Sequence, residues 1–323
     1  PPRSTLFPYT TLFRSTSLSS QRTFKINRDN ANLRCTPLGF KTIRSIILAH
    51  SLPLAHQKIS LFTLIMPNPI ALAIFDIDGV VRDVSGSYRR AIADTVEQFT
   101  QGHYRPTPKD IDQLKSEGIW NNDWKASQEL IQRHSDASGH SYSSNYDDIV
   151  LYFQERYRGS GDDPSQWVGY ITQEPVLMSA QYLTDLAEGG VPSAFFSGAT
   201  RGSANYILRQ RIGLANPILI AMADAPSKPD PTGLYLTIDQ LEATVPKGLP
   251  VLYAGDTVAD MATVKAAQNQ FPERVWLAIG VLPPHVQTDQ TDADYQARYS
   301  KTLTDAGANL VIPHIEQDRN SVR

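Results

Sequence analysis

The chain has 323 residues, of which 41% are hydrophobic and 20% charged, values typical of a globular protein with one large domain or two modest ones. From Met66 onward it holds 32 acidic and 21 basic residues, a balance that argues against binding to nucleic acid or an anionic membrane. The only cysteine, Cys35, precedes Met66, and no apolar run is long enough to span a bilayer. We therefore expect a soluble, cytoplasmic protein without a disulfide, a thiolate metal site or a cysteine nucleophile in its body.

Residues 1–65 hold nine basic residues and one acid, Asp29, and they allow two interpretations. A Ser-, Thr- and Arg-rich stretch almost without acids is typical of an organellar transit peptide. Alternatively the stretch is non-native, because its first fifteen residues resemble a translated sequencing adapter and position 1 is not Met. We favour Met66 as the true start and expect residues 1–65 to lie outside the fold; an organellar location would follow only from a genuine transit peptide.

From Ala71 the chain alternates short apolar runs with amphipathic stretches, which predicts an α/β fold with a parallel sheet flanked by helices. More than a hundred residues separate the first two strands, far beyond an ordinary connection, so we expect an inserted helical cap. The expected division is a core of residues 66–86 plus 190–323 and a cap of residues 87–189. The predicted strands are 71–75, 192–196, 217–221, 250–254, 274–279 and 309–312.

The insert carries several helix signals. Thr107 followed by Pro108 and Asp110 is typical of a helix start, and Gly118 offers a stop. Apolar residues at helical spacing predict three further helices. These are 122–134, 146–158 and 176–188.

Two acids, Asp76 and Asp78, follow the first predicted strand directly and precede Gly79. Side chains two residues apart in a strand share a face, and glycine lets the chain turn aside at that point. Two close carboxylates stay ionised only if a cation or hydrogen-bond donors lie between them. Oxygen ligands without a neighbouring histidine or cysteine favour a hard ion such as Mg²⁺.

Three later loops carry complementary chemistry. Ser197 and Gly198 follow the second strand, Lys228 lies between prolines, and Asp256 and Asp260 follow the strand at 250–254. Ligands bind beyond the carboxyl ends of the strands in open α/β sheets, so these loops are expected to converge. Acids that hold a divalent cation and a lysine and serine that hold phosphate would together form a phosphate site.

The ordered set resembles the four motifs of the haloacid dehalogenase superfamily: Asp76-x-Asp78-Gly79-Val80, Ser197, Lys228-Pro229 and Gly255-Asp256-x-x-x-Asp260. The resemblance covers about residues 70–312. An insert between the first two motifs is similar to subfamily IA, the group with helical caps like that of phosphoglycolate phosphatase. The resemblance implies a Rossmann-like core and an enzyme acting on phosphoric monoesters.

The resemblance also implies a role for each motif residue. Asp76 would be the nucleophile that forms an aspartyl-phosphate, and Asp78 the acid and base that serves the leaving alcohol and then water. Mg²⁺ would be held by Asp76, the Asp78 backbone carbonyl and Asp256, with direct or water-mediated support from Asp260. The phosphoryl oxygens would bind Ser197, Gly198 and Lys228.

The same set leaves several functions open. Dehalogenating relatives lack the second aspartate, so the presence of Asp78 argues against dehalogenation. We expect a Mg²⁺-dependent phosphatase of a small phosphorylated metabolite, similar to phosphoglycolate or a sugar phosphate. The alternatives are a phosphomutase of the same fold and a non-catalytic phosphometabolite-binding protein.

Some residues have a structural interpretation beside the functional one. Asp260 could simply cap a helix. The stretch Trp120, Asn121, Asn122, Asp123 and Trp124 is a possible substrate loop, or else it caps a helix with buried tryptophans. Arg82, Arg89 and Arg90 could reach a substrate or orient the nucleophile loop, but solvated positions are expected of them. The histidines at 103, 134, 140, 285 and 314 show no metal spacing and no adjacent partner, and are interpreted as structural or surface residues.

Overall fold

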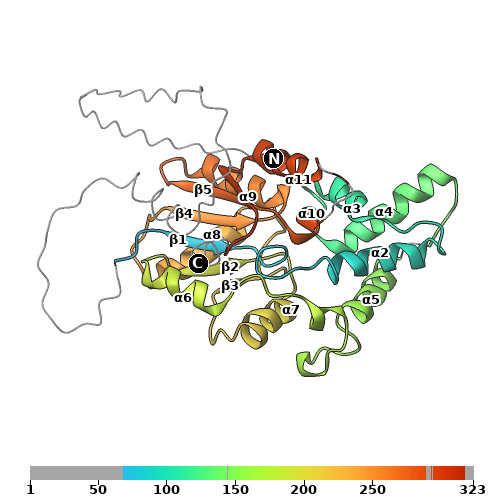
Figure 1. Cartoon of the computed structure of the whole chain (residues 1–323), viewed down its shortest axis with the longest axis horizontal. Helices are drawn as coiled ribbons and strands as arrows, with labels where there is room; N and C mark the ends of the chain where they lie inside the picture. The colour runs from blue at the N-terminus through green and yellow to red at the C-terminus, as the bar shows by residue number, and fades with distance from the viewer. Residues whose placement is uncertain (1–67, 144, 289–291, 293, 317–323) are drawn as a thin grey trace, which may run out of the picture. The chain divides into compact units, whose positions relative to one another are not determined.

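The computed structural model describes residues 68–143, 145–288, 292 and 294–316, all within one compact unit. The expectations for residues 1–65 therefore lie outside the described residues. Six parallel strands form a single sheet in the order β3-β2-β1-β4-β5-β6 (Figure 1). No helix within the described residues is long and apolar enough to cross a bilayer.

All six predicted strands are confirmed, with ends that shift by at most two residues. Their apolar runs are buried because helices cover both faces of the parallel sheet. In order the strands are β1 (Leu72–Phe75), β2 (Ser193–Phe196), β3 (Leu219–Ile220), β4 (Val251–Gly255), β5 (Trp276–Val281) and β6 (Leu310–Ile312).

Side chains alternate between the two faces of the sheet. Ala73 and Phe75 pack in a cluster with α6 (Ala180–Glu188), α7 (Arg201–Asn205) and the π-helical turn η3 (Tyr206–Arg211). Leu72 and Ile74 pack in a second cluster on the other face. That cluster contains residues of α8 (Thr232–Glu242), α9 (Val258–Gln270) and α11 (Tyr295–Ala306). The short helix α10 (Pro284–Thr288) precedes α11.

The insert between β1 and β2 forms a helical bundle with its own apolar cluster, which includes Ile92, Ile131 and Phe153. Helices α2, α4 and α5 lie side by side, away from the sheet (Figure 1). The bundle comprises α2 (Tyr88–Phe99), α3 (Pro108–Lys115), α4 (Asp123–Ser138), α5 (Tyr146–Tyr157) and the 3-10 helices η1 (Pro164–Gln166) and η2 (Tyr170–Gln173). Of these, α2 has no counterpart among the predicted helices.

The second connection between cap and core differs from the expected one. Tyr182, Leu183 and Leu186 of α6 pack against the sheet rather than in the bundle cluster. Helix α6 covers the sheet because its apolar stripe complements the face that carries Phe75. We therefore propose that the cap ends near Pro175, before α6, and not at residue 189.

Helix starts follow the predicted capping chemistry. The Thr107 hydroxyl accepts a hydrogen bond from the Asp110 amide, and the Asp110 carboxylate accepts one from the Thr107 amide. This capping box begins α3 where the sequence predicts it. The Asn122 side chain accepts hydrogen bonds from the Trp124 and Lys125 amides at the start of α4.

Candidate active site

Strands β1 and β4 are neighbours in the sheet, and this pairing brings the first and fourth motifs together. Phe75 lies opposite Ala254, and the Asp76 amide donates a hydrogen bond to the Ala254 carbonyl over 2.8 Å. Gly79 adopts φ +78°, and a Cβ built there would lie 2.1 Å from Asp256 Oδ2. The close approach of the Gly79 backbone to Asp256 therefore requires glycine.

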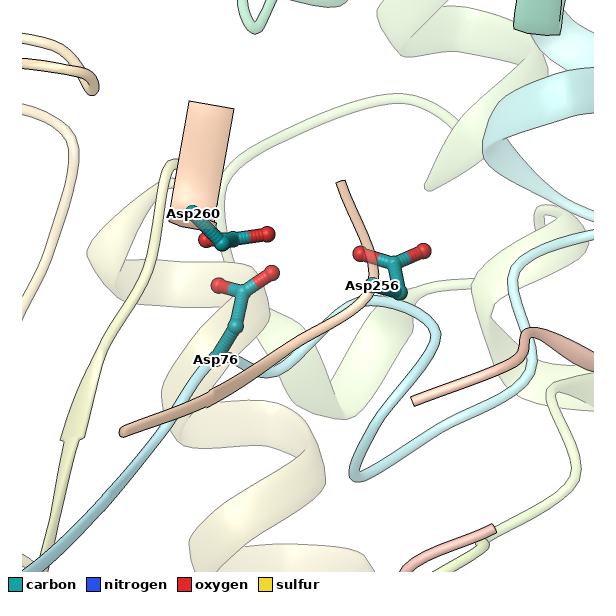
Figure 2. Close-up of side chains that lie close together, drawn as sticks. All are labelled: Asp76, Asp256 and Asp260. Atoms are coloured by element: carbon teal, nitrogen blue, oxygen red, sulfur yellow. The ribbon is translucent and has the colours of Figure 1, made fainter. Parts of the chain in front are cut away.

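The acids gather around Lys228. Lys228 Nζ lies 2.9 Å from Asp76 Oδ1 and 2.5 Å from Asp260 Oδ1. Lys228, Asp76, Asp256 and Asp260 are all buried, and carboxylate oxygens of the three acids lie within 4.8 Å of one another. Figure 2 shows the three carboxyl groups around one common space. We call these four residues the Asp76 cluster.

Asp260 serves both the cluster and its helix. Its Oδ1 accepts hydrogen bonds from Lys228 and from the Tyr253 hydroxyl, the latter over 2.9 Å. Its Oδ2 accepts hydrogen bonds from the amide and hydroxyl of Thr257, which completes a capping box at the start of α9. The helix-cap interpretation of Asp260 is therefore confirmed, while the same carboxylate also holds Lys228.

The carboxylates outnumber the cations in the Asp76 cluster. Burial raises the pKa of Asp76 to about 7 although Lys228 lowers it, and burial also raises the pKa of Asp256 well above its ordinary value. Burial would lower the pKa of Lys228, but Asp260 and Asp76 hold it above the ordinary value. With all four groups ionised, three negative charges face one positive charge.

The charge of Asp256 is offset only in part, by the more distant charges of Arg89 and Lys115. Within the described part of the chain, neither of its carboxylate oxygens accepts a hydrogen bond or joins an ion pair. A buried carboxylate is costly unless it is paired, protonated or bound to a cation. The charge excess and this unpartnered carboxylate fit one divalent cation beside Asp76 and Asp256.

Asp78 differs from these acids because its side chain is 24% exposed. Its Oδ1 accepts a hydrogen bond from Arg82 Nε over 2.7 Å. Arg82 is completely buried, so its expected solvated position is wrong. Arg89 is also buried, in an ion pair with Asp112, whereas Arg90 is half-exposed, as expected, and lies over the Tyr170 ring.

A cavity of about 50 Å³ opens between core and cap at these residues. Asp76, Asp78 and Asp256 line it from the core, as do Gly198 and the two residues that follow it. Ser197 itself is buried, and its hydroxyl accepts a hydrogen bond from the Ala199 amide over 3.2 Å. The four strand-end loops therefore converge on one space, with Lys228 and Ser197 buried beside it.

The proposed substrate loop divides into two roles. Asn121, Asp123 and Trp124 line the cavity, and a Cβ built on Gly198 would lie 2.7 Å from Asn121 Nδ2. Asn122 caps α4, and Trp120 Nε1 donates a hydrogen bond to Glu117. The loop therefore has two roles: it caps helix α4, and it forms part of the surface of the cap domain that faces Asp76, Asp78 and Asp256 across the cavity.

Sequence reasoning missed several residues at this site. Lys115 ends α3, lines the cavity and pairs with Asp123 over 2.7 Å. Lys115 and Thr257 also line a second cavity of about 250 Å³ between α3 and α11. His285 does have a partner, since its Nε2 lies 3.0 Å from Asp112 Oδ2. No regular spacing reveals these pairs, because Asp123 lies eight residues from Lys115, in the next helix, and Asp112 lies 173 residues from His285.

Comparisons with known proteins agree with this arrangement. A family model described as haloacid dehalogenase-like hydrolase matches residues 70–268. A curated relative, an imidazoleglycerol-phosphate dehydratase from Phytophthora nicotianae, is 28% identical over 252 residues, which make up 76% of this chain and 51% of the relative. The chain thus spans about half the length of that relative.

Several solved structures share the fold. A phosphonoacetaldehyde hydrolase-like protein from Oleispira antarctica aligns with a TM-score of 0.55 and 16% identity, over 83% of this chain and 95% of its own. A haloacid dehalogenase-like protein of unknown function from Agrobacterium tumefaciens aligns with a TM-score of 0.51 and 18% identity, over 77% and 94%. CbbY from Rhodobacter sphaeroides, solved with phosphate, aligns with a TM-score of 0.50 and 15% identity, over 76% and 95%.

The family model spans more than half of the chain, from β1 into α9, and contains all four motif loops. The predictions of an α/β core, of this family and of an enzyme are confirmed. The chain belongs to the haloacid dehalogenase-like hydrolases.

Proposed function

We propose that the protein is a Mg²⁺-dependent phosphatase that hydrolyses a small phosphorylated metabolite through an aspartyl-phosphate on Asp76. The observation that carries this proposal is the Asp76 cluster, in which buried acids exceed their cations beside a cavity that also exposes Asp78. The predicted roles of the motif residues are consistent with these positions.

In this proposal Asp76 attacks phosphorus. Its carboxylate lines the cavity, and Lys228 lies against Oδ1. The ammonium of Lys228 favours the ionised, nucleophilic form and would attract the phosphoryl oxygens as they approach. A divalent cation bound by Asp76 and Asp256 would offset the charge of the phosphate and of the attacking carboxylate.

In this proposal Asp78 transfers the protons. It would protonate the leaving oxygen as the ester bond breaks, and then take a proton from the water that hydrolyses the aspartyl-phosphate. Partial exposure suits this task because leaving group and water must both reach the carboxyl group. The Gly198 backbone and the buried Ser197 would contribute to holding the phosphoryl group.

The two cavities suggest the size of the substrate. The 50 Å³ cavity has room for little more than a phosphoryl group, while the 250 Å³ cavity shares Lys115 and Thr257 with it. We propose that the leaving group extends toward the second cavity, where Lys109, Arg298 and Tyr299 also lie. The phosphate monoester in the name of the Phytophthora relative belongs to the same class of small phosphorylated metabolite.

The test is phosphate release by the full-length chain from a panel of phosphate monoesters, with Mg²⁺ and with EDTA. We expect release from at least one alkyl phosphate, with a requirement for Mg²⁺, and loss of release in Asp76→Asn. No release from any monoester, or release unchanged in Asp76→Asn, would refute the proposal. An isomerised product that depends on a bisphosphate activator would instead identify a phosphomutase.

A further inference from the structure

Arg82 occupies an unusual position for a charged residue. It lies in the turn after β1, six residues beyond Asp76, and its side chain has no exposed surface. Nε donates a hydrogen bond to Asp78 Oδ1 over 2.7 Å, and Nη1 donates one to Glu174 Oε2 over 3.0 Å. A guanidinium completely removed from water needs such partners, because its burial is otherwise costly.

Glu174 fixes the far side of the guanidinium independently of Asp78. Its side chain is buried near the proposed end of the cap, and its Oε1 accepts a hydrogen bond from the Ser87 hydroxyl over 2.5 Å. The two chain segments that join cap and core also pair through their backbones. The Asp83 amide donates to the Pro175 carbonyl over 2.9 Å, and the Leu177 amide donates to the Val81 carbonyl over 2.8 Å.

The two oxygens of Asp78 have different surroundings. Oδ1 is held by Arg82 Nε, whereas in the described part of the chain Oδ2 has no hydrogen-bond partner. Asp78 lines the cavity beside Asp76. One oxygen is thus fixed by a buried donor, and the other remains available to substrate or water.

We propose that Arg82 is a positioning residue that orients Asp78 for proton transfer, with Glu174 as its anchor. The inference rests on the proposed phosphatase function. In the first step an Asp76 oxygen bonds to phosphorus as the ester bond breaks, and the leaving oxygen takes a proton from Asp78. In the second step Asp78 removes a proton from water as the water oxygen bonds to phosphorus and the bond between the Asp76 oxygen and phosphorus breaks. Both proton transfers use the oxygen that Arg82 leaves unpaired.

A matched pair of double variants isolates the contact to Asp78. In R82Q/E174Q the amide nitrogen of the introduced glutamine stands at the same place along the side chain as Arg82 Nε, so it still donates to Asp78. In R82M/E174Q a methyl group stands there, and the donor is lost. Both variants remove the buried charges together, which is far less destabilising than leaving Glu174 without its cation. R82Q/E174L and R82M/E174L give the same comparison if the first pair fails to fold.

The readout is kcat/KM for the best alkyl phosphate of the panel relative to kcat/KM for p-nitrophenyl phosphate, with Mg²⁺ present. This quantity covers the steps through departure of the leaving group and leaves out hydrolysis of the aspartyl-phosphate, which is common to both esters. Nitrophenolate leaves without a proton, whereas an alkoxide needs one, so in these steps only the alkyl ester depends strongly on Asp78. We expect R82M/E174Q to lower this ratio by about 10²-fold, and R82Q/E174Q to restore it to within about tenfold of the wild type.

A merely structural role for Arg82 would lower both activities together and leave the ratio unchanged. Equal ratios in the two double variants would overturn the inference, even with an active wild-type phosphatase. A wild-type protein that releases phosphate from neither class of ester would instead refute the proposed function.

Discussion

Two clusters of buried charge lie near the junction of cap and core, and they are built differently. The Asp112 cluster joins Asp112 of α3 to Arg89, His285 and Tyr295, each of which contacts its carboxylate. Burial would raise the pKa of Asp112, but Arg89 and His285 hold it below the ordinary value. In the Asp76 cluster, burial raises the pKa values of Asp76 and Asp256 instead.

The difference separates a cluster that is satisfied within the protein from the one that we propose as the active site. Every part of the Asp112 carboxylate is satisfied by donors within the protein, so it ties cap to core without further help. The Asp76 cluster keeps an excess of carboxylate charge, and an excess of this kind is expected where a site must bind a cation and hold a nucleophile. The predictions below test this contrast, beginning with the largest effect.

Lys228→Met should affect the protein most. Removal of the only cation in the Asp76 cluster leaves Asp76 and Asp260 without their ion pairs, at a cost of about 3–5 kcal/mol in unfolding free energy. Loss of the phosphate-binding charge should also lower kcat by about 10³-fold. Urea unfolding and phosphate release measure the two effects. A variant with activity within tenfold of the wild type would contradict the role of Lys228.

The Asp76 cluster was largely predictable from the sequence, because two of its acids directly follow apolar runs. Asp76, Ser197 and Asp256 come immediately after β1, β2 and β4, and neighbouring parallel strands end at one edge of a sheet. The strands themselves were predictable for the same reason. A buried parallel strand needs a short, nearly continuous apolar run, and the turn residues after it are distinctive.

The structural contacts were not predictable, because their partners are far apart in the chain. Glu174 lies 92 residues from Arg82, and His285 lies 173 residues from Asp112. A charged residue without visible partners is expected to be solvated, so Arg82 and Arg89 were placed wrongly. Helix α6 was assigned to the cap because helical spacing shows that a face is apolar and does not show what covers it.

The pH dependence of stability should have opposite signs in the two clusters when EDTA is present. Asp76 has its pKa raised to about 7 by burial, so its ionisation costs folding free energy that grows between pH 4 and pH 7 and then stays constant. The free energy of unfolding of Asp76→Asn should therefore equal that of the wild type near pH 4 and exceed it by about 2–4 kcal/mol at pH 8.

Asp112→Asn is the matched comparison. The pKa of Asp112 is lowered in the folded state, so its stabilising contribution is present above the ordinary aspartate pKa and is lost as the pH falls. This variant should be less stable than the wild type at pH 8 and approach it at low pH. Unfolding curves at several pH values measure both variants, and the same sign in both would contradict the contrast between the clusters.

Mg²⁺ should stabilise the protein through the Asp76 cluster alone. A ligand at 100 times its Kd raises the free energy of unfolding by about 2.7 kcal/mol, which corresponds to a rise in Tm of about 5–10 °C for a domain of this size. Asp256→Asn should abolish this shift because it removes the unpartnered carboxylate, whereas Asp112→Asn should retain it. A shift in Tm that survives Asp256→Asn would place the cation elsewhere.

Two adjacent asparagines allow the finest test, because one lines the cavity and the other caps a helix. Asn122→Ala removes the acceptor for the Trp124 and Lys125 amides and should cost about 1 kcal/mol of stability, with little change in KM. Asn121→Ala should leave stability nearly unchanged, because Asn121 provides no such cap, and should raise KM several-fold through its place beside Gly198. Urea unfolding and steady-state kinetics on both variants separate the two roles. Equal effects on KM would mean that the loop acts on substrate only through the position of α4.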